Sequence, residues 1–243
     1  MWLSFENGYA GLISKFMRHK PKAKTFCIPS VLPYYPIFLN IQGKKCVVVG
    51  GGHVAFRKVR MLLDSGADVT VISPTLHPDF APLVEKKAIH LIQRNYRSGD
   101  LKGAILVFAA TDVKKTNHRV AEDAMKAGRL VNVVDDPGPS DFIIPSFFRR
   151  ENLIIAVSTE GVSPALARKI RTKLEESIGK EYASLVALIG EVRSTLKDKG
   201  LKVDAEDWQQ ALDCDALIPL VQSGNLKKAK TILLNKLKVH KTI

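Results

Sequence analysis

The chain has 243 residues, of which 46% are hydrophobic and 25% are charged, as is usual for a globular protein with a sizeable core. Its formal net charge of +13 favours anionic partners, such as nucleic acid, an anionic membrane surface or a polyanionic small molecule. The longest apolar runs are shorter than the roughly 18 residues of a membrane span. Three widely spaced cysteines argue against a disulfide framework or a structural zinc site, so we expect a cytoplasmic protein.

Residues 1–33 differ in pattern from the rest of the chain. Aromatic and aliphatic residues between Trp2 and Met17 recur at near-helical spacing, and a basic run follows at 18–24. This pattern predicts either a helix on a membrane surface, formed by residues 2–24, or a loosely ordered extension. The extension is favoured, because short isolated helices are marginally stable and chain termini are usually loose.

The segment 46–73 has the pattern of strand, glycine turn, helix and strand, which is typical of a βαβ unit. Its turn has the spacing G-x-G-x-x-A, with Gly50, Gly52 and Ala55 at the three small positions. Gly50 permits a tight turn, and Gly52 lets a pyrophosphate approach the backbone closely. The phosphates would then meet free N–H groups at the positive end of the helix dipole.

Apolar runs and amphipathic segments alternate from residue 45 to residue 134, which predicts a parallel, doubly wound sheet of the Rossmann type. The expected strands lie near 45–49, 69–72, 89–93, 104–110 and 130–134, and the expected helices lie near 53–65, 78–87 and 114–127. Ligands of such sheets bind at the carboxyl ends of the strands. Polar turns follow the strands at Gly50, Ser73, Thr111-Asp112 and Asp135-Asp136.

The pattern changes after Asp135. Two short apolar runs, 142–148 and 153–157, are separated by a polar turn and predict a hairpin. Ser163 and Pro164 then predict the start of a helix, with Ser163 as its N-cap, that ends near Ile178. The remainder is helical in pattern, with helices expected near 180–199, 205–212, 215–223 and 226–238.

Several separated motifs resemble the precorrin-2 dehydrogenase family, the dehydrogenase and ferrochelatase module of sirohaem synthesis. They are VVVGGGHVAFRKVRMLLDSGADVTVISP at 47–74, FAATD at 108–112 with Asn117, NVVDDP at 132–137, FIIPS at 142–146 and AVSTEGVSPALARKIR at 156–171. The resemblance extends in order over about residues 34–200. It implies oxidation of precorrin-2 to sirohydrochlorin with NAD⁺. In bifunctional members ferrous iron is then inserted, and the sequence leaves this second activity open.

The resemblance also implies a homodimer with four parts in each chain. These are an N-terminal extension at 1–33, an NAD-binding Rossmann domain at 34–140, a dimerisation region of hairpin and helix at 141–178, and a small helical domain at 179–243.

The family's essential aspartate ends the strand of its N-V-V-D motif, so the resemblance assigns catalysis to Asp135. A carboxylate at a strand's carboxyl end can face a nicotinamide and accept the proton that is lost when a hydride leaves. From the residues alone, Asp135 could equally cap the turn that follows it. Asp136 is the neighbouring alternative for the catalytic role.

The remaining candidate residues lie at the strand ends of the sheet and in the motifs that carry the resemblance. The expected cofactor residues are Gly50, Gly51, Gly52, His53, Val54, Ser73, Pro74, Thr111 and Asp112. The expected substrate residues are Asn132, Ser158, Thr159 and Arg168. Capping of the next helix is an alternative for Asp112, surface exposure for His53, and loop hydrogen bonding for the two hydroxyls of Ser158 and Thr159. A guanidinium group suits a substrate with eight carboxylates.

Ser73 departs from the usual pattern of NAD-binding sheets, which carry an acid at the end of the second strand to hold the ribose hydroxyls. NAD is expected through the resemblance, but a serine does not repel the 2′-phosphate of NADP.

Histidines and cysteines do not cluster at ligand spacing, so we expect no metal site. The sequence is compatible with two other classes of function: a non-catalytic NAD-binding regulator with a basic nucleic-acid surface, and a membrane-surface scaffold. A nucleic-acid surface would need a helix-turn-helix or basic residues interleaved with aromatics, and the C-terminal lysines have no aromatics nearby. We therefore expect small-molecule substrates and no nucleic acid.

Overall fold

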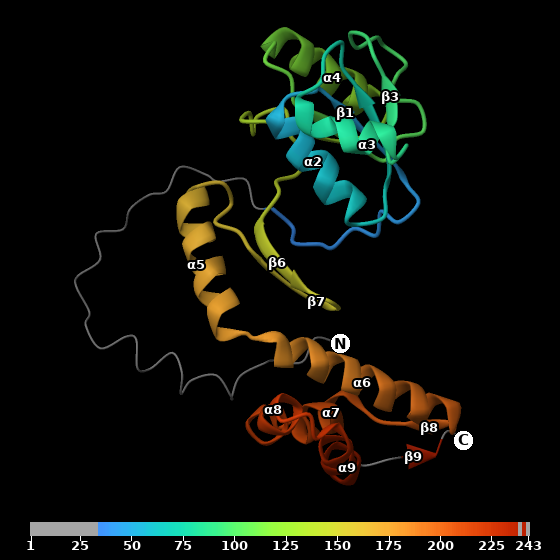
Figure 1. The fold of residues 1–243 in the computed structure, drawn as a ribbon, viewed down its shortest axis with the longest axis vertical. Coiled ribbons are helices and arrows are strands. Elements are labelled where there is room, and N and C mark those ends of the chain that lie inside the picture. The colour runs from blue at the N-terminus through green and yellow to red at the C-terminus, as the bar shows by residue number, and fades with distance from the viewer. Residues whose placement is uncertain (1–33, 238–239, 242–243) are drawn as a thin grey trace, which may run out of the picture. The chain divides into compact units, whose positions relative to one another are not determined.

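The computed structural model describes residues 34–237 and 240–241 (Figure 1). The predictions for the extension at 1–33, including membrane contact through residues 2–24, lie outside the described residues. Within the described part, no helix is both long enough and apolar enough to cross a membrane.

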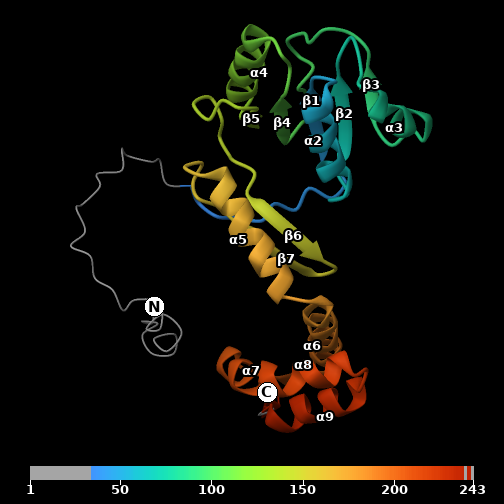
Figure 2. The same ribbon diagram turned by 60° about the vertical axis from the view of Figure 1, so that its left-hand side comes forward.

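A five-stranded parallel sheet forms the first part of the described chain. Its strands are β1 (Lys45–Val49), β2 (Asp68–Ile72), β3 (His90–Ile92), β4 (Leu106–Ala109) and β5 (Leu130–Val133). They lie in the order β3-β2-β1-β4-β5, which Figure 2 shows with β5 at one edge and β3 at the other. In β1, Val49 pairs with Ile72 on one side and with Ala109 on the other. This order is that of a Rossmann sheet, and it confirms the predicted fold class.

Side chains of each strand alternate between two apolar layers, because successive residues of a strand point to opposite faces. Val48 and Phe108 belong to the layer covered by α2 (His53–Leu63), which contributes Ala55, Val59 and Leu62. Val47, Val107 and Val131 belong to the opposite layer, which is covered by α4 (Lys114–Lys126). Continuous burial of the strands explains their β-branched runs, and both faces of the sheet are closed to water.

The prediction of one continuous helix at 78–87 is wrong. The structure has a 3₁₀ turn, η1 (Pro78–Phe80), followed by the short helix α3 (Ala81–Glu85). The side chain of His77 accepts a hydrogen bond from the N–H of Asp79, which caps the 3₁₀ turn. Pro82 lacks an N–H group, so one α-helix cannot run through η1 and α3 with all its bonds made.

The predicted hairpin is present as β6 (Ser146–Arg150) and β7 (Leu153–Val157), with different bounds. The segment 142–145 is not part of the strand, because Phe142 and Ile144 pack against the Rossmann core. Arg149 and Arg150 are strand residues, and the turn shrinks to two residues with Glu151 at a φ of 51°.

The helix α5 (Pro164–Ser177) follows the hairpin and packs beside it. Its predicted N-cap is confirmed, because the Ser163 Oγ accepts a hydrogen bond from the N–H of Leu166 at 3.2 Å.

The C-terminal part is helical as predicted, with its own apolar core. Its elements are α6 (Lys180–Asp198), α7 (Ala205–Ala211), α8 (Cys214–Gln222) and α9 (Leu226–Lys236), with a short antiparallel pair, β8 (Leu201–Lys202) and β9 (His240–Lys241). Leu217 and Leu233 are fully buried at its centre, where they pack with Val192 and Trp208. The β8–β9 pair was not predicted, because a strand of two residues is too short to show the alternation of polar and apolar residues that marks a strand.

We predict that Leu217→Ala lowers the free energy of unfolding of this helical part by about 2–5 kcal/mol, because it removes buried methyl groups and leaves a cavity. Leu226→Ala is the matched control, since Leu226 is 45% exposed and its truncation should cost less than about 0.5 kcal/mol. Guanidinium unfolding followed by circular dichroism measures both. Equal stability of the two variants would contradict the placement of Leu217 in this core.

Candidate functional site

A cleft of about 710 Å³ opens at the carboxyl ends of β1, β2, β3 and β4. It is lined by the turns that follow these strands and by the first residues of α2 and α4. The lining residues are Val49, Gly50, Gly51, Gly52, His53, Val54, Ile72, Ser73, Pro74, Thr75, Leu76, His77, Asn95, Tyr96, Ala110, Thr111, Asp112, Val113, Thr116 and Arg119. The structure therefore brings all nine expected cofactor residues together in one cleft.

The glycine turn after β1 is shaped by close backbone contacts. Gly50 has a φ of 128°, and a Cβ placed on it would lie 2.2 Å from the carbonyl oxygen of Ala110. A Cβ on Gly51 would lie 2.1 Å from the carbonyl oxygen of Thr75. Both positions exclude any side chain, so these two glycines are required by the fold itself.

Gly52 has a different environment, because a Cβ placed on it would meet no protein atom within 4 Å. Its φ of −78° is open to any residue, so neither packing nor backbone strain explains a glycine here. Gly52 is the N-cap of α2, it has no capping side chain, and the first turn of α2 holds no acidic residue. An open, positively polarised helix start fits the pyrophosphate of a dinucleotide.

The turn after β2 packs against the glycine turn. The Ser73 hydroxyl donates a hydrogen bond to the Thr75 carbonyl oxygen at 2.7 Å, and Ser73 is buried. The N–H of His77 donates to the carbonyl oxygen of Gly51 at 2.7 Å. The ring of His77 lies 5.7 Å from the ring of His53. Ser73 therefore shapes the turn, and two imidazoles line the cleft where an acidic residue is usual.

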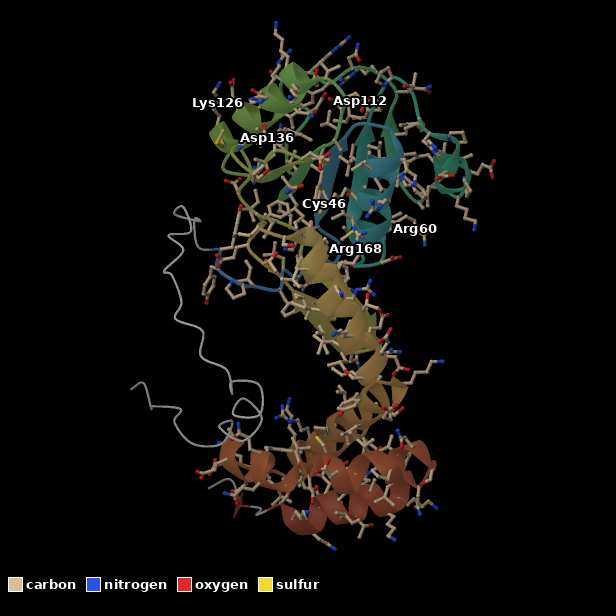
Figure 3. The ribbon with its side chains drawn as sticks, turned by 90° about the vertical axis from the view of Figure 1, so that its left-hand side faces the viewer. Cys46, Arg60, Asp112, Lys126, Asp136 and Arg168 are labelled. Carbon is tan, nitrogen blue, oxygen red and sulfur yellow. The ribbon has the colours of Figure 1, made fainter. Side chains whose placement is uncertain are left out.

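The turn after β4 is held by the amide of Asn117, which is buried on α4. The N–H and hydroxyl of Thr111 donate to its Oδ1 at 3.1 and 2.6 Å, and its Nδ2 donates to the Thr111 carbonyl oxygen at 2.8 Å. Asp112 is exposed beside this clamp (Figure 3). The N-cap of α4 is Val113, which has no side-chain capping bond, so capping by Asp112 was the wrong alternative.

A fourth wall of the cleft, the loop after β3, was not predicted. Asn95 and Tyr96 line the cleft from this loop. The Tyr96 hydroxyl donates to Asp123 Oδ2 at 2.9 Å, and burial together with this bond raises the pKa of Tyr96 above its usual value. Arg94 donates to both carboxylate oxygens of Asp100 at 2.8 Å. The strand-end rule, applied to the third strand as well, would have found this wall.

Asp135 and Asp136 have separate surroundings after β5. Asp136 Oδ1 accepts a hydrogen bond from the N–H of Gly138 at 3.3 Å, and its Oδ2 lies 3.5 Å from His118 Nε2. Asp135 has a φ of 58°, and no described residue forms a hydrogen bond with its carboxylate. Capping of the turn therefore belongs to Asp136, which leaves the Asp135 carboxylate available for other contacts.

The four expected substrate residues and Asp135 do not line the 710 Å³ cleft. Asn132 Nδ2 donates to the carbonyl oxygen of Phe142 at 2.9 Å. The hydroxyls of Ser158 and Thr159 each accept a hydrogen bond at 3.0 Å, from the N–H groups of Glu160 and Ser163. Both hydroxyls therefore form hydrogen bonds within the loop, which was the alternative to substrate binding for these two residues.

Arg168, the fourth expected substrate residue, is exposed on α5 (Figure 3).

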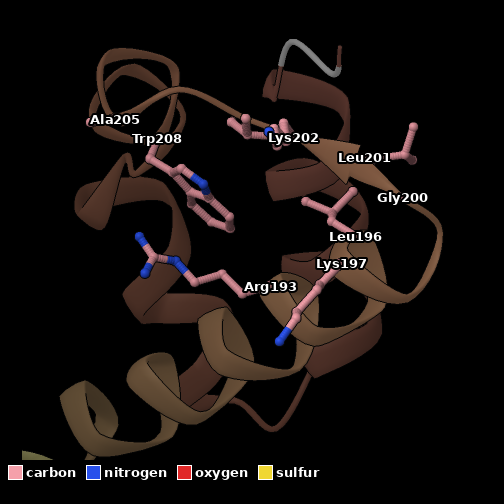
Figure 4. Close-up of a pocket in the computed structure, with 9 residues that line it drawn as sticks. Arg193, Leu196, Lys197, Gly200, Leu201, Lys202, Ala205 and Trp208 are labelled. Carbon is pink, nitrogen blue, oxygen red and sulfur yellow. The ribbon is translucent and has the colours of Figure 1, made fainter. Parts of the chain in front are cut away.

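A second hollow, of about 450 Å³, lies in the helical part between α6, β8 and α7 (Figure 4). The Arg193 guanidinium lies 4.9 Å from the centre of the Trp208 ring, and Lys197 and Lys202 also line the hollow. Within residues 34–237 and 240–241, no three His, Cys, Asp or Glu side chains are grouped so that they could hold a metal ion.

Two family models match adjoining segments of the chain. A model of NAD(P)-binding domains matches residues 37–146, which include the whole parallel sheet. A model of the central part of sirohaem biosynthesis proteins matches residues 150–177, which include β7 and α5.

Curated relatives and a solved structure agree with these models. The chain is 39% identical to a sirohaem synthase of Photobacterium profundum over 206 residues, which are 84% of this chain and 44% of the relative. It is 42% identical to a sirohaem synthase of Nitrosococcus oceani over 183 residues, which are 74% of this chain and 39% of the relative. The chain thus spans less than half the length of these relatives.

The structure resembles that of SirC, a precorrin-2 dehydrogenase, with a TM-score of 0.66 and 25% sequence identity. The match covers 84% of this chain and 98% of SirC, so it includes parts beyond the Rossmann domain. The chain thus contains an NAD(P)-binding domain followed by the central segment of sirohaem biosynthesis proteins, and it is similar to sirohaem synthases and to the precorrin-2 dehydrogenase SirC.

Proposed function

We propose that this protein oxidises precorrin-2 to sirohydrochlorin with NAD⁺ as a step of sirohaem synthesis. The observation that carries the proposal is a carboxylate without a hydrogen-bond partner among the described residues, that of Asp135, which follows β5, the strand next to β4, whose end lines the cleft. The names of the relatives supply the substrate, and the resemblance to SirC over most of both chains supports the dehydrogenase reaction.

The residues that line the cleft would hold the cofactor through backbone N–H groups and polar turns. When bound, NAD⁺ supplies the hydride acceptor. The open side of Gly52 and the first N–H groups of α2 bind the pyrophosphate, because this helix start is free of acidic side chains. The turn from Ser73 to His77 and the Thr111 clamp line the same cleft, so they would hold the remainder of the dinucleotide.

Asp135 acts as the general base of the oxidation. The macrocycle loses two electrons and one proton as a hydride, and it also loses a second proton. A positioned carboxylate that accepts this second proton contributes about 10²–10⁴-fold to such a step. Asp136 is already bonded to the turn through Gly138, so Asp135 is the better candidate.

The positive charge of the chain suits the substrate. The net charge is +13, and the substrate carries carboxylates on all its pyrrole rings. We assign one carboxylate contact to Arg168, because an exposed guanidinium can bind a carboxylate in a bidentate manner. The hydroxyls of Ser158 and Thr159 order the loop that precedes its helix.

The protein works in the cytoplasm as a homodimer in this proposal. Cys46 and Cys214 are unpaired, and burial, aided by the charge of Asp68, raises the pKa of the Cys46 thiol to about 11. Unpaired cysteines suit a reducing compartment.

The proposed dimer contact is on α5. Leu166 and Ile170 are exposed on this helix at a spacing of four residues, so they form an apolar strip on one helix face.

We predict that Gly52→Ala weakens NAD⁺ binding at least about tenfold, because a methyl group fills the space in front of the helix start. The fold should lose less than about 1 kcal/mol, since the new methyl meets no protein atom. Gly190→Ala, in the open interior of α6, is the control and should leave binding unchanged. Titration calorimetry measures the affinities. Unaltered affinity in Gly52→Ala would place the pyrophosphate elsewhere.

We predict that Asp135→Asn lowers turnover of precorrin-2 by about 10²-fold or more while NAD⁺ affinity changes less than about twofold. Asp136→Asn should retain most of the turnover, because its amide can keep the turn contact with Gly138. Anaerobic assays of NADH formation measure both variants, and a second arm with sirohydrochlorin and Fe²⁺ tests iron insertion. Loss of turnover in Asp136→Asn alone would transfer the general-base role to Asp136.

We predict that the double variant Leu166→Glu, Ile170→Glu converts the dimer to a monomer, because four charges would face one another across a symmetric contact. Glutamates at Lys169 and Lys173, which are exposed on the same helix, give a matched control that remains dimeric. Light scattering after size-exclusion chromatography measures the mass. A monomeric wild-type protein would rule out the proposed dimer.

A further inference from the structure

The hollow of about 450 Å³ between α6, β8 and α7 has no part in the proposed oxidation (Figure 4). It is smaller than the 710 Å³ cofactor cleft, so it suits a ligand smaller than a dinucleotide. Pairing of β8 with β9 fixes the strand that forms one side of it. The apolar part of its lining consists of Leu196, Leu201, Val203 and Ala205.

The polar side chains that line this hollow are all hydrogen-bond donors. Arg193, Lys197 and Lys202 are cations, and Trp208 adds an indole N–H group. Guanidinium, ammonium and indole groups have no atom that accepts a hydrogen bond. None of the described residues that line the hollow is acidic, and Asp204, which lies close by in the chain, does not line it. A complementary ligand must therefore supply acceptors, as an oxyanion does.

The indole of Trp208 is fixed by the core of the helical part. Trp208 is 7% exposed and belongs to the same apolar cluster as Leu217 and Leu233. Its side chain lines the hollow, yet its Nε1–H donates a hydrogen bond to no described residue. A largely buried indole N–H usually has a partner, so an acceptor on a ligand would complete this site.

The guanidinium of Arg193 is held by the same indole. It lies 4.9 Å from the centre of the Trp208 ring, at a distance typical of a cation–π contact. Such a contact restricts the guanidinium and leaves the N–H groups at its edge able to bind an oxyanion through two parallel bonds. A rigid donor pair, Arg193 and Trp208, thus stands beside an apolar wall.

We propose that this hollow is a binding site for an organic anion, in which a carboxylate or phosphate group is joined to a flat apolar body. Arg193 and Trp208 bind the oxyanion, and Lys197 and Lys202 add positive charge. The apolar wall contacts the body of the ligand. The inference goes beyond the proposed function, because all the lining residues lie between 193 and 208 and none belongs to the cofactor cleft.

Fluorescence of Trp208 reports binding at the hollow. The chain has two tryptophans, so Trp2→Phe in the full chain leaves Trp208 as the only emitter. Saturating NAD⁺ keeps the cofactor cleft filled. The anionic probes are adenosine monophosphate and isophthalate, and their uncharged counterparts are adenosine and isophthalamide. We expect at least one anion to alter the emission with a dissociation constant at least about tenfold below that of its uncharged counterpart.

Substitutions in the same background locate the site. Arg193→Met and Lys202→Met should each weaken binding of that anion about tenfold, because each removes a charged donor. Arg193→Lys keeps the charge but not the planar fork, so it should recover only part of the affinity. Lys199→Met is the matched control, because it removes an exposed charge at the end of α6 that does not line the hollow. Circular dichroism checks that each variant folds.

The two probes distinguish the sources of the anion. A response to adenosine monophosphate alone would identify a phosphate ligand, and a response to isophthalate alone would identify a carboxylate ligand. An equal affinity for inorganic phosphate would overturn the role of the apolar wall.

Two further results would overturn the site itself. One is an unchanged emission with both anions at up to about 10 mM, which would leave no specific affinity. The other is an unchanged affinity in folded Arg193→Met and Lys202→Met proteins. Oxidation of precorrin-2 is measured separately, through NADH, so its failure would overturn the proposed function and leave the fluorescence result standing.

Discussion

Steric exclusion at the first strand end governs the whole site. The backbones of three strand ends meet so closely that neither Gly50 nor Gly51 has room for a Cβ, with carbonyl oxygens of Ala110 and Thr75 about 2 Å from where it would lie. This contact fixes the turns after β2 and β4 against the turn after β1. The start of α2 is then held open in front of Gly52, where a pyrophosphate can approach the N–H groups. The fold thus requires Gly50 and Gly51, whereas the cofactor site explains Gly52.

The second strand end shows how the cleft departs from the usual NAD site. Ser73 turns its hydroxyl toward its own loop, and His53 and His77 line the cleft nearby. An acid at this position would repel a 2′-phosphate, and neither serine nor imidazole does so. The matching family model describes NAD(P)-binding domains, and the Ser73–His77 turn contributes no negative charge to this side of the cleft.

Much of the fold could be predicted because its signals are local. β-branched runs, a glycine turn and the Ser163-Pro164 cap each reflect the backbone conformation that they favour, and the sheet and helices were placed within a few residues. The nine expected cofactor residues share one cleft because strand ends of a parallel sheet meet at one edge. The hairpin bounds were wrong because the apolar run at 142–145 reflects packing on the Rossmann core, which apolarity alone does not distinguish from a strand.

Other features depend on contacts between distant segments. The hydrogen bond between Tyr96 and Asp123, which are 27 positions apart, joins two residues whose roles no local pattern marks.

The proposed reaction is the oxidation of a tetrapyrrole by NAD⁺, with Asp135 as the general base. Its most direct test is an anaerobic incubation of the full chain with precorrin-2 and NAD⁺, in which NADH and sirohydrochlorin are quantified together. The account predicts that both products form in equal amounts. A folded, NAD-binding protein that forms neither product would contradict it.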